Sequence, residues 1–571
     1  MSPAEIHKQL ALLAEKEKRR KQYRAAAREL TAIAEWHRTS NKPSRMIPLV
    51  CQVRTVVSNE VALHKATLED DGTPALFDFQ LEGIDKGLQL LGESYRSCQL
   101  IAPTGSGKTY FAARLALLLR KLYPDKYPAN KPIIWLTKPS IVRQSCRVHG
   151  QYKLTNLFCF SYPQMVSSIG RLFVTWTTRI VNNTPTLWPD WNADTLPSLV
   201  IVDEAQAGKN MDSQQSMIMQ ALVEKGVPIM FMSATPYSRP IHTRLIATAL
   251  CPLVKFGYDD KHPLTDRIFP TWIASISAPK SPLEWCPAAM RRIQDVLEPY
   301  TIRFGKLKYK HRCFIKQMVM AITNPEKRRI YNEAFEEYQE KRIAADLDPL
   351  EGFSAVLVAM MKFRQISEII RADDIAELIY QFRYRDGKLP IAAFSFVDAL
   401  KLTYQCLLKK GVKEDEIALI MGGQSAEERQ RNIDEFQSEK RKFMLLSFNA
   451  GGAGLSLHQY EPVNTTSRVV VLPPVWNSED LVQVLGRAHR CNSGSTTYQY
   501  IVWYSGTIEE EVCARVKHKC EALKEVARSG DSWADDFAGV KTVRKKIVME
   551  KKVEDEEEEE NFSELPVTVE N

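Results

Sequence analysis

The fold follows from one stretch, QLIAPTGSGKTYFAARLALLL (Gln99 to Leu119). It contains an apolar strand, a glycine-rich turn and a helical segment in direct succession. Glycines in such a turn let backbone N–H groups converge on phosphate oxygens at the N-terminus of a helix. The pattern predicts that Lys108 reaches the β- and γ-phosphates of a nucleotide and that the Thr109 hydroxyl holds Mg²⁺. Ala102 departs from the general pattern, which has glycine there. The predicted nucleotide-binding residues of this loop are Ala102, Pro103, Thr104, Gly105, Ser106, Gly107, Lys108 and Thr109.

A second chemical motif, VDEAQ (Val202 to Gln206), ends the apolar run LVIVDE. Ligands of open α/β sheets bind outside the carboxyl ends of the strands, so these carboxylates should emerge at the same edge as the glycine-rich loop. Asp203 is predicted to bind Mg²⁺ through water, and Glu204 to orient and deprotonate an attacking water. An acidic strand end is common in isolation, but the accompanying phosphate loop favours the catalytic interpretation.

Two further segments offer side chains to a nucleotide. Gln80 lies 28 residues before Lys108, and its amide presents both a donor and an acceptor to an adenine edge. In QVLGRAHR (Gln483 to Arg490), Arg487 and Arg490 are three residues apart and share one helical face. Two guanidinium groups on a face suit stabilisation of transferring phosphate charge, with a structural ion pair as the competing interpretation. Because they lie about 380 positions from Lys108, they must come from a second lobe that closes on the first.

Three segments suit contact with the phosphate backbone of a nucleic acid. Thr137 and Lys138 lie at the end of an apolar strand in WLTKPS, and Ser395 lies in AFSF. In LSFNAGGAGLSL (Leu446 to Leu457), glycines allow the backbone to approach a phosphate of either ATP or nucleic acid. Of these glycines, we assign Gly451 and Gly452 to nucleic acid and Gly454 to the nucleotide.

Strand-like and helix-like segments alternate from about residue 76, as in a parallel sheet with crossover helices. The alternation pauses between residues 255 and 380, which look mostly helical, and resumes after about residue 385. The predicted fold is therefore α/β, with two parallel-sheet lobes in tandem and a helical insert between them. The expected strands are QLIAP, IIWLT, LVIVDE and IMFMSAT in the first lobe and IAAFSF, EIALIM, FMLLSF, RVVVLPP and YQYIVWY in the second. The expected parts are a basic N-terminal helix (1–45), a first lobe (60–260), a helical insert (261–380), a second lobe (381–530) and a disordered charged tail (531–571).

Bulk composition limits the classes of function. A chain of 571 residues is too long for a single hydrophobic core. Its net charge of +8 hides nine acidic residues and no basic residue from Glu554 onward, so the remainder carries +17. Such a positively charged body suits a polyanionic partner, with general solubility as the plainer explanation.

No apolar run approaches the ~18 residues of a membrane span, and the start lacks the apolar core of a signal peptide, so no membrane association is expected. Eleven scattered cysteines without a CxxC pair predict free thiols rather than a metal site, in an intracellular compartment that is either nuclear or viral and cytoplasmic.

Taken together, these strings resemble the helicases and translocases of superfamily 2, over roughly residues 76 to 525. The chain is most similar to the Swi/Snf-type double-stranded-DNA translocases, through VDEAQAGKN, NPEKRRIY (Asn324 to Tyr331), KFRQIS (Lys362 to Ser367), GGQSAEERQRNIDEF (Gly422 to Phe436) and GTIEEEV (Gly506 to Val512). SATP in place of TGTP, and Gly486 in place of aspartate, are more typical of general superfamily 2 helicases. GRAHRCNS also resembles the strawberry-notch-type helicases and the nucleoside triphosphatases of large DNA viruses.

The resemblance implies two RecA-like lobes with ATP and Mg²⁺ in their cleft and nucleic acid lying across both. It implies a nucleic-acid-stimulated ATPase that steps along a phosphate backbone as a translocase or helicase, with DNA as the expected partner and RNA as the alternative. It implies functional roles in the site for Gln80, Lys108, Thr109, Asp203, Glu204, Gln483, Arg487 and Arg490. It also implies that Ser233, Ala234 and Thr235 couple the two lobes. Two other functions stay open, namely a transcription-coupled or viral nucleoside triphosphatase acting on single-stranded DNA or RNA, and a nucleic-acid-binding scaffold without catalysis.

Overall fold

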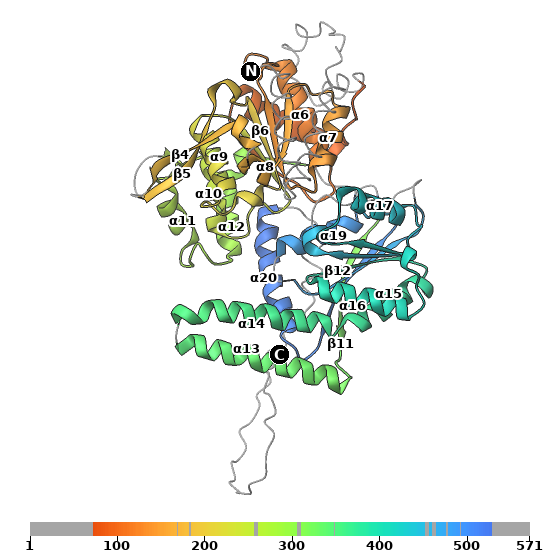
Figure 1. The fold of residues 1–571 in the computed structure, drawn as a ribbon. Coiled ribbons are helices and arrows are strands. Elements are labelled where there is room, and N and C mark those ends of the chain that lie inside the picture. The colour runs from red at the N-terminus through yellow and green to blue at the C-terminus, as the bar shows by residue number, and fades with distance from the viewer. Residues whose placement is uncertain are drawn as a thin grey trace, which may run out of the picture. The chain divides into compact units, whose positions relative to one another are not determined.

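The computed structural model describes residues 72–527 apart from residues 168, 182–183, 256–260, 305–309, 348, 452–455, 460–463, 476–477 and 491–492. The expected N-terminal helix (1–45), the charged tail (531–571), Gly452 and Gly454 lie outside the described residues. Within them the chain forms two α/β lobes, each built on its own parallel sheet (Figure 1). This arrangement confirms the predicted fold class.

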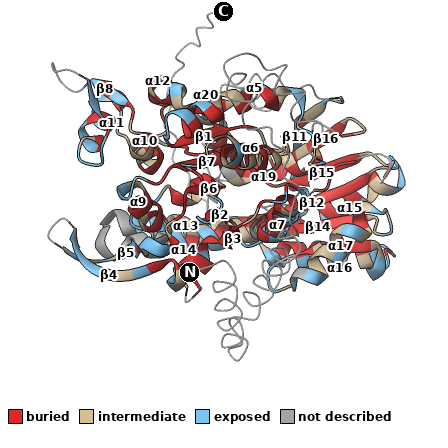
Figure 2. Cartoon of the chain, turned by 90° about the horizontal axis from the view of Figure 1, so that it is seen from above, coloured by how far each residue is buried: buried red, intermediate tan, exposed pale blue. Residues whose placement is uncertain are grey.

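The sheet of the first lobe runs in the order β10-β1-β7-β6-β2-β3, and all neighbouring strands are parallel. Most residues of its strands are apolar and buried, as expected for a parallel sheet covered by helices (Figure 2). The order places β7 directly between β1 and β6, so the glycine-rich loop and VDEAQ leave the sheet at the same edge. The strands are β1 (Cys98–Ile101), β2 (Ile133–Thr137), β3 (Leu157–Ser161), β6 (Leu199–Asp203), β7 (Ile229–Ser233) and β10 (Thr301–Arg303). The helices of this lobe are α5 (Asp78–Gly87), α6 (Lys108–Leu122), α7 (Val142–Gln151), α8 (Tyr162–Val166), α9 (Gln214–Glu224), α10 (Arg244–Leu250), α11 (Phe269–Ser277) and α12 (Pro287–Leu297).

The sheet of the second lobe runs in the order β11-β16-β15-β12-β14-β13, again parallel throughout. Successive residues of its strands face opposite sides, so Ile391 and Ala392 enter two different hydrophobic clusters. Its strands are β11 (Cys313–Met320), β12 (Leu389–Phe394), β13 (Ile417–Ile420), β14 (Phe443–Ser447), β15 (Arg468–Leu472) and β16 (Thr497–Tyr504). One cluster includes residues of α15 (Ala372–Tyr384) and α16 (Val397–Lys409), and the other includes residues of α17 (Ala426–Gln437) and α19 (Ser478–Ala488); the short α18 (Phe448–Gly451) follows β14.

The boundary between the lobes differs from the expected one. β10 is an edge strand of the first sheet and β11 an edge strand of the second, so residues 261–380 do not form a separate insert. α11 and α12 pack in the core of the first lobe. α13 (Pro325–Leu347) and α14 (Pro349–Ile369) form a helical pair (Figure 1) whose Phe363 packs with Tyr504 of β16. Sequence patterns missed the two edge strands because one is three residues long and the other is only partly buried.

Two antiparallel hairpins were also missed. β4 (Val174–Val181) pairs with β5 (Thr184–Trp191), and β8 (Leu253–Lys255) pairs with β9 (Lys261–Pro263). The first hairpin lies between β3 and β6 along the chain and packs on α9. Neither hairpin contains a residue of the glycine-rich loop or of VDEAQ.

One helix joins the two lobes. α20 (Glu509–Ala527) begins in the second lobe, where Val512 and Val516 are buried in its core. Near its other end Val526 is fully buried in the core of the first lobe, and Arg303 Nη2 of β10 donates to Val526 O at 2.9 Å. Across the described part of the chain, no helix combines the length and apolar character needed to cross a bilayer.

Candidate active site

The glycine-rich loop connects β1 to α6 as predicted. Gly105 and Gly107 adopt φ angles of 77° and 81°, a backbone conformation that favours glycine. Ala102 is not in that region, which explains why it does not need to be glycine. Its backbone N–H donates to Ser233 O of β7 at 3.3 Å, so the loop is anchored to the neighbouring strand.

Side chains from the loop and from α5 hold the loop in shape. Lys108 Nζ donates to the carbonyl oxygens of Ala102 and Pro103, each at 3.0 Å. Gln80 is buried, and its Nε2 donates to Ser106 O at 2.9 Å and to Gly107 O at 3.2 Å. In this structure the Gln80 amide therefore supports the backbone of the loop, and its role toward adenine stays a prediction. Thr109 is half-buried in the first turn of α6.

The two carboxylates lie at the end of β6. Asp203 is buried, and burial raises the pKa of its carboxyl to about 7, with repulsion from Glu204 as the second cause. Its oxygens accept hydrogen bonds from Glu204 N at 3.0 Å and from Thr137 Oγ1 at 3.3 Å. Glu204 has φ 56° and ψ 53°, a left-handed conformation that costs a non-glycine residue roughly 1–3 kcal/mol. The Tyr162 hydroxyl fixes this turn by donating to Asp203 O at 2.6 Å.

A chain of hydrogen bonds connects Glu204 to the segment expected to couple the lobes. Gln206 Nε2 donates to Glu204 Oε2 at 2.6 Å, and Gln206 Oε1 accepts from Ser233 Oγ at 2.6 Å. Ser233 Oγ in turn accepts from Thr235 N at 2.9 Å, and Ala234 is half-buried between them. Gln206 belongs to VDEAQ, but the sequence did not indicate its role, and no sequence signal pointed to Tyr162.

The second lobe completes the site through α19. Gln483 Nε2 donates to Glu204 Oε2 at 3.3 Å, and Lys138 Nζ donates to Gln483 Oε1 at 3.3 Å. A Cβ atom built on Gly105 would lie 2.7 Å from Arg490 Cγ, so the Arg490 side chain lies against the loop. A Cβ atom on Gly486 would lie 1.7 Å from Thr104 Oγ1. The structure thus brings α19 into contact with the glycine-rich loop.

The charges of both lobes interact at this point. The pKa of Lys108 is lowered, mainly because the side chain is buried. The carboxylates of Glu204 and Asp203 oppose this shift, and the guanidinium groups of Arg487 and Arg490 add to it. Burial also lowers the pKa of Arg487, against the attraction of the same two carboxylates. Three cationic side chains therefore surround two carboxylates in a buried setting, which leaves a site that favours an additional anion.

The donor set fits a nucleoside triphosphate with Mg²⁺. The loop supplies backbone N–H groups at the N-terminus of α6, and Lys108, Arg487 and Arg490 supply positive charge. Oxygen ligands for a hard cation are available from Asp203 and Thr109. Among the described residues no cluster of three or more His, Cys, Asp or Glu side chains could hold a metal without a substrate.

The predicted nucleic-acid contacts fare differently. Thr137 is fully buried and its hydroxyl donates to Asp203, so in this structure its side chain serves the carboxylate pair. Lys138 is half-buried, and its Nζ donates to Gln483 Oε1 of the second lobe. The backbone N–H of Ser395 donates to buried Glu368 at 2.8 Å, and Gly451 ends α18. Their contacts with nucleic acid stay predictions.

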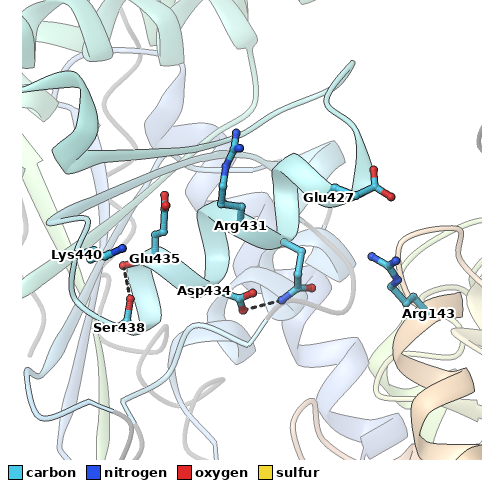
Figure 3. Close-up of a pocket in the computed structure, with 8 residues that line it drawn as sticks. Arg143, Glu427, Arg431, Asp434, Glu435, Ser438 and Lys440 are labelled. Atoms are coloured by element: carbon cyan, nitrogen blue, oxygen red, sulfur yellow. Dashed lines mark hydrogen bonds between the residues drawn. The ribbon is translucent and has the colours of Figure 1, made fainter.

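A second, open groove is lined by residues of both lobes (Figure 3). Arg143, in the first turn of α7, lies across from α17 of the second lobe, where Gln430 Nε2 donates to Asp434 Oδ1 at 2.8 Å. Its lining mixes acidic and basic side chains, so the groove does not present one sign of charge to a ligand. The lining residues are Arg143, Glu427, Gln430, Arg431, Asp434, Glu435, Ser438 and Lys440.

Comparison with known families agrees with this geometry. A family model described as DEAD/DEAH box helicase matches residues 78–243, and a model of the helicase conserved C-terminal domain matches residues 371–492. The chain belongs to the superfamily 2 helicases. Each model covers the core of one lobe, and the glycine-rich loop, VDEAQ and α19 fall inside them. The Swi/Snf-like character expected from the sequence is confirmed by the chromatin-remodelling ATPases among the relatives of this helicase.

Individual relatives match only parts of this helicase. It is 25% identical over 348 residues to an uncharacterized ATP-dependent helicase, MG018, of Mycoplasma genitalium, a match that covers 57% of this chain and 30% of that protein. It is 29% identical over 148 residues to the DNA repair protein rhp54 of Schizosaccharomyces pombe, covering 25% and 16%. The helicase thus spans less than a third of the length of these relatives. The solved SWI2/SNF2 ATPase core of Sulfolobus solfataricus in complex with dsDNA has 18% identity and a TM-score of 0.31, covering 81% of this chain and 94% of that one.

Proposed function

We propose that this helicase hydrolyses ATP with Mg²⁺ between its two lobes and uses the cycle to move along DNA. The observation that carries the proposal is the meeting of the glycine-rich loop with α19, because residues from opposite lobes then form one site. A site made of two lobes changes when they separate, so nucleotide turnover and lobe movement are coupled.

The residues have distinct roles in this proposal. Lys108, Arg487 and Arg490 bind the phosphates and stabilise the charge that develops during transfer. Glu204 accepts the proton of the attacking water, Gln206 orients its carboxylate, and Gln483 connects that carboxylate to the second lobe. Asp203 and Thr109 would hold Mg²⁺, which supplies neutralisation of phosphate charge when bound.

DNA is the proposed partner because the chain without its acidic tail carries +17. One named relative points the same way, since it is a DNA repair protein. RNA and single-stranded DNA are the alternative substrates. A catalytically inactive scaffold is disfavoured because Lys108, Asp203, Glu204 and both arginines are present.

ATP turnover on a panel of nucleic acids tests the proposal. Duplex DNA should stimulate the wild-type chain more than single-stranded DNA or RNA does. Glu204→Gln and Lys108→Ala should abolish stimulated turnover, and Arg487→Ala should lower it at least ~10³-fold. Arg329→Ala, which removes an exposed arginine on α13, is the matched control and should retain full activity. Full activity of Glu204→Gln would contradict the site, and stimulation by RNA alone would favour the alternative substrate.

A further inference from the structure

Lys138 lies where the ATP site meets the surface. Its neighbour Thr137 is buried and bonded to Asp203, whereas the next residues, Pro139 and Ser140, are exposed. Lys138 is half-buried between them and extends to the second lobe, where its Nζ lies 3.3 Å from Gln483 Oε1. One lysine side chain therefore connects an exposed loop with a catalytic glutamine.

The contact fixes the orientation of the Gln483 amide. A primary amide has one acceptor oxygen and one donor nitrogen, and a lysine can only donate. Because Lys138 engages the oxygen, the NH₂ group faces Glu204 and donates to Oε2 at 3.3 Å. Gln206 donates to the same oxygen at 2.6 Å. Two amide donors thus bond to Glu204 Oε2 and keep an attacking water away from this oxygen while both stay in place.

We propose that Lys138 is a positioning residue that reports nucleic-acid binding to Glu204 through Gln483. An ammonium group bonds more strongly to a phosphate than to a neutral amide oxygen, because the phosphate adds the attraction of an opposite charge. A backbone phosphate at the exposed end of this loop draws Lys138 away from Gln483. The Gln483 amide is then no longer held in place by Lys138 and can leave Glu204 Oε2. This oxygen loses one of its two donors, and Glu204 can accept the proton of the attacking water. This inference rests on the proposed function.

Replacement of Lys138 by methionine tests the relay, because methionine keeps an extended side chain without the donor. Lys138→Met should raise ATP turnover without nucleic acid by roughly tenfold, the change expected from loss of one hydrogen bond to the base. Turnover with saturating duplex DNA should stay within about twofold of wild type, so the stimulation factor falls and KM for ATP is unchanged. Lys131→Met, which removes an exposed lysine just before β2, should behave as wild type.

A double-mutant cycle separates the relay from a merely structural contact. If Lys138 acts through Gln483, Lys138→Met should have no further effect on unstimulated turnover in a Gln483→Ala background. An equal effect in both backgrounds, or lower turnover of Lys138→Met with and without DNA, overturns the relay. If DNA stimulates ATP turnover of the wild type, and stimulates Lys138→Met by the same factor, the relay is overturned but the proposed function stands. Absence of stimulation in the wild type overturns the proposed function as well.

Discussion

The position of Gly486 shows how a single residue sets the distance between the lobes. Swi/Snf-type proteins usually carry aspartate there, and the structure explains why this chain does not. A Cβ atom at this position would lie 1.7 Å from Thr104 Oγ1 and 2.6 Å from Thr104 Cβ. Atoms of ordinary size cannot approach so closely, so any side chain at 486 would push α19 away from the glycine-rich loop.

We therefore expect Gly486→Ala to lower stimulated kcat by roughly 100-fold, the effect of displacing reacting groups by about 1 Å. The helix itself should not suffer, since alanine is a better helix former than glycine by ~0.5–1 kcal/mol. Thr104→Gly removes the clashing atoms, so the loss caused by Gly486→Ala should be smaller in that background. Steady-state ATPase kinetics measure both effects.

Gly422→Ala is the matched control, because a Cβ atom there meets nothing within 4 Å. Its kcat should equal that of the wild type. If Gly486→Ala caused the same loss in the wild-type chain and in the Thr104→Gly background, the contact would not set the distance between the lobes.

At the scale of elements, α14 positions a loop of the second lobe. Glu368, near the C-terminal end of α14, is buried, and its Oε1 accepts from the backbone N–H groups of Ser395 at 2.8 Å and Phe396 at 3.2 Å. Burial raises the pKa of Glu368 to about 7, while Arg371 counteracts the shift. The AFSF segment, with its predicted nucleic-acid contact, is therefore held by a carboxyl group with a raised pKa.

This pKa predicts a pH dependence of stability. Between the unfolded value of about 4.3 and the folded value of about 7, the folded chain binds a proton that the unfolded chain releases. Stability from this group therefore falls as pH rises, by about 1.4 kcal/mol per pH unit, and levels off above about pH 7. Glutamine does not titrate, so relative to wild type Glu368→Gln should gain about 2 kcal/mol between about pH 5.5 and about pH 8.

Thermal unfolding of both proteins at the two pH values measures this difference, which corresponds to about 4–8 °C in the midpoint of a lobe of this size. The same substitution at exposed Glu340 of α13 controls for the loss of a surface carboxylate. A constant difference between Glu368→Gln and wild type across the pH range would show that Glu368 is charged throughout.

At the scale of the whole molecule, α20 is a continuous connection between the two halves of the active site. Its first turns are buried in the second lobe, and Val526 is buried in the first. An exposed ion pair between Arg291 of α12 and Glu525, with distances of 2.6 and 2.8 Å, lies beside that contact. The buried valine should matter more than the ion pair, because exposed pairs contribute only ~0–1 kcal/mol.

Val526→Asp should detach the end of α20 from the first lobe, since an unpaired buried carboxylate costs several kcal/mol. We expect lower stimulated turnover, because Arg487 and Arg490 then lose their fixed distance from the loop, and faster proteolysis near residue 527. Arg291→Ala should leave both properties close to wild type. Wild-type turnover of Val526→Asp would show that closure of the lobes does not depend on α20.

Local patterns were sufficient for much of this protein. A glycine-rich turn between a strand and a helix, and a carboxylate pair after an apolar strand, are defined by adjacent residues, so Lys108, Asp203 and Glu204 could be located and the two parallel sheets anticipated. The arginines of α19 could be assigned to the second lobe for the same reason, because their spacing and their distance along the chain are visible in the letters alone.

Other features depend on residues that meet only after folding. Thr137 and Lys138 were predicted to contact nucleic acid because both lie at the end of a strand, yet one bonds to Asp203 and the other to a glutamine 345 residues away. β10 and β11 are recognisable only from their neighbours in the sheets. The need for glycine at 486 is likewise a property of Thr104 on the opposite lobe. Periodicity and motif spacing predict the local structure that a segment forms with residues close to it in the sequence. Contacts across the sheet and between the lobes depend instead on the packing of the whole chain.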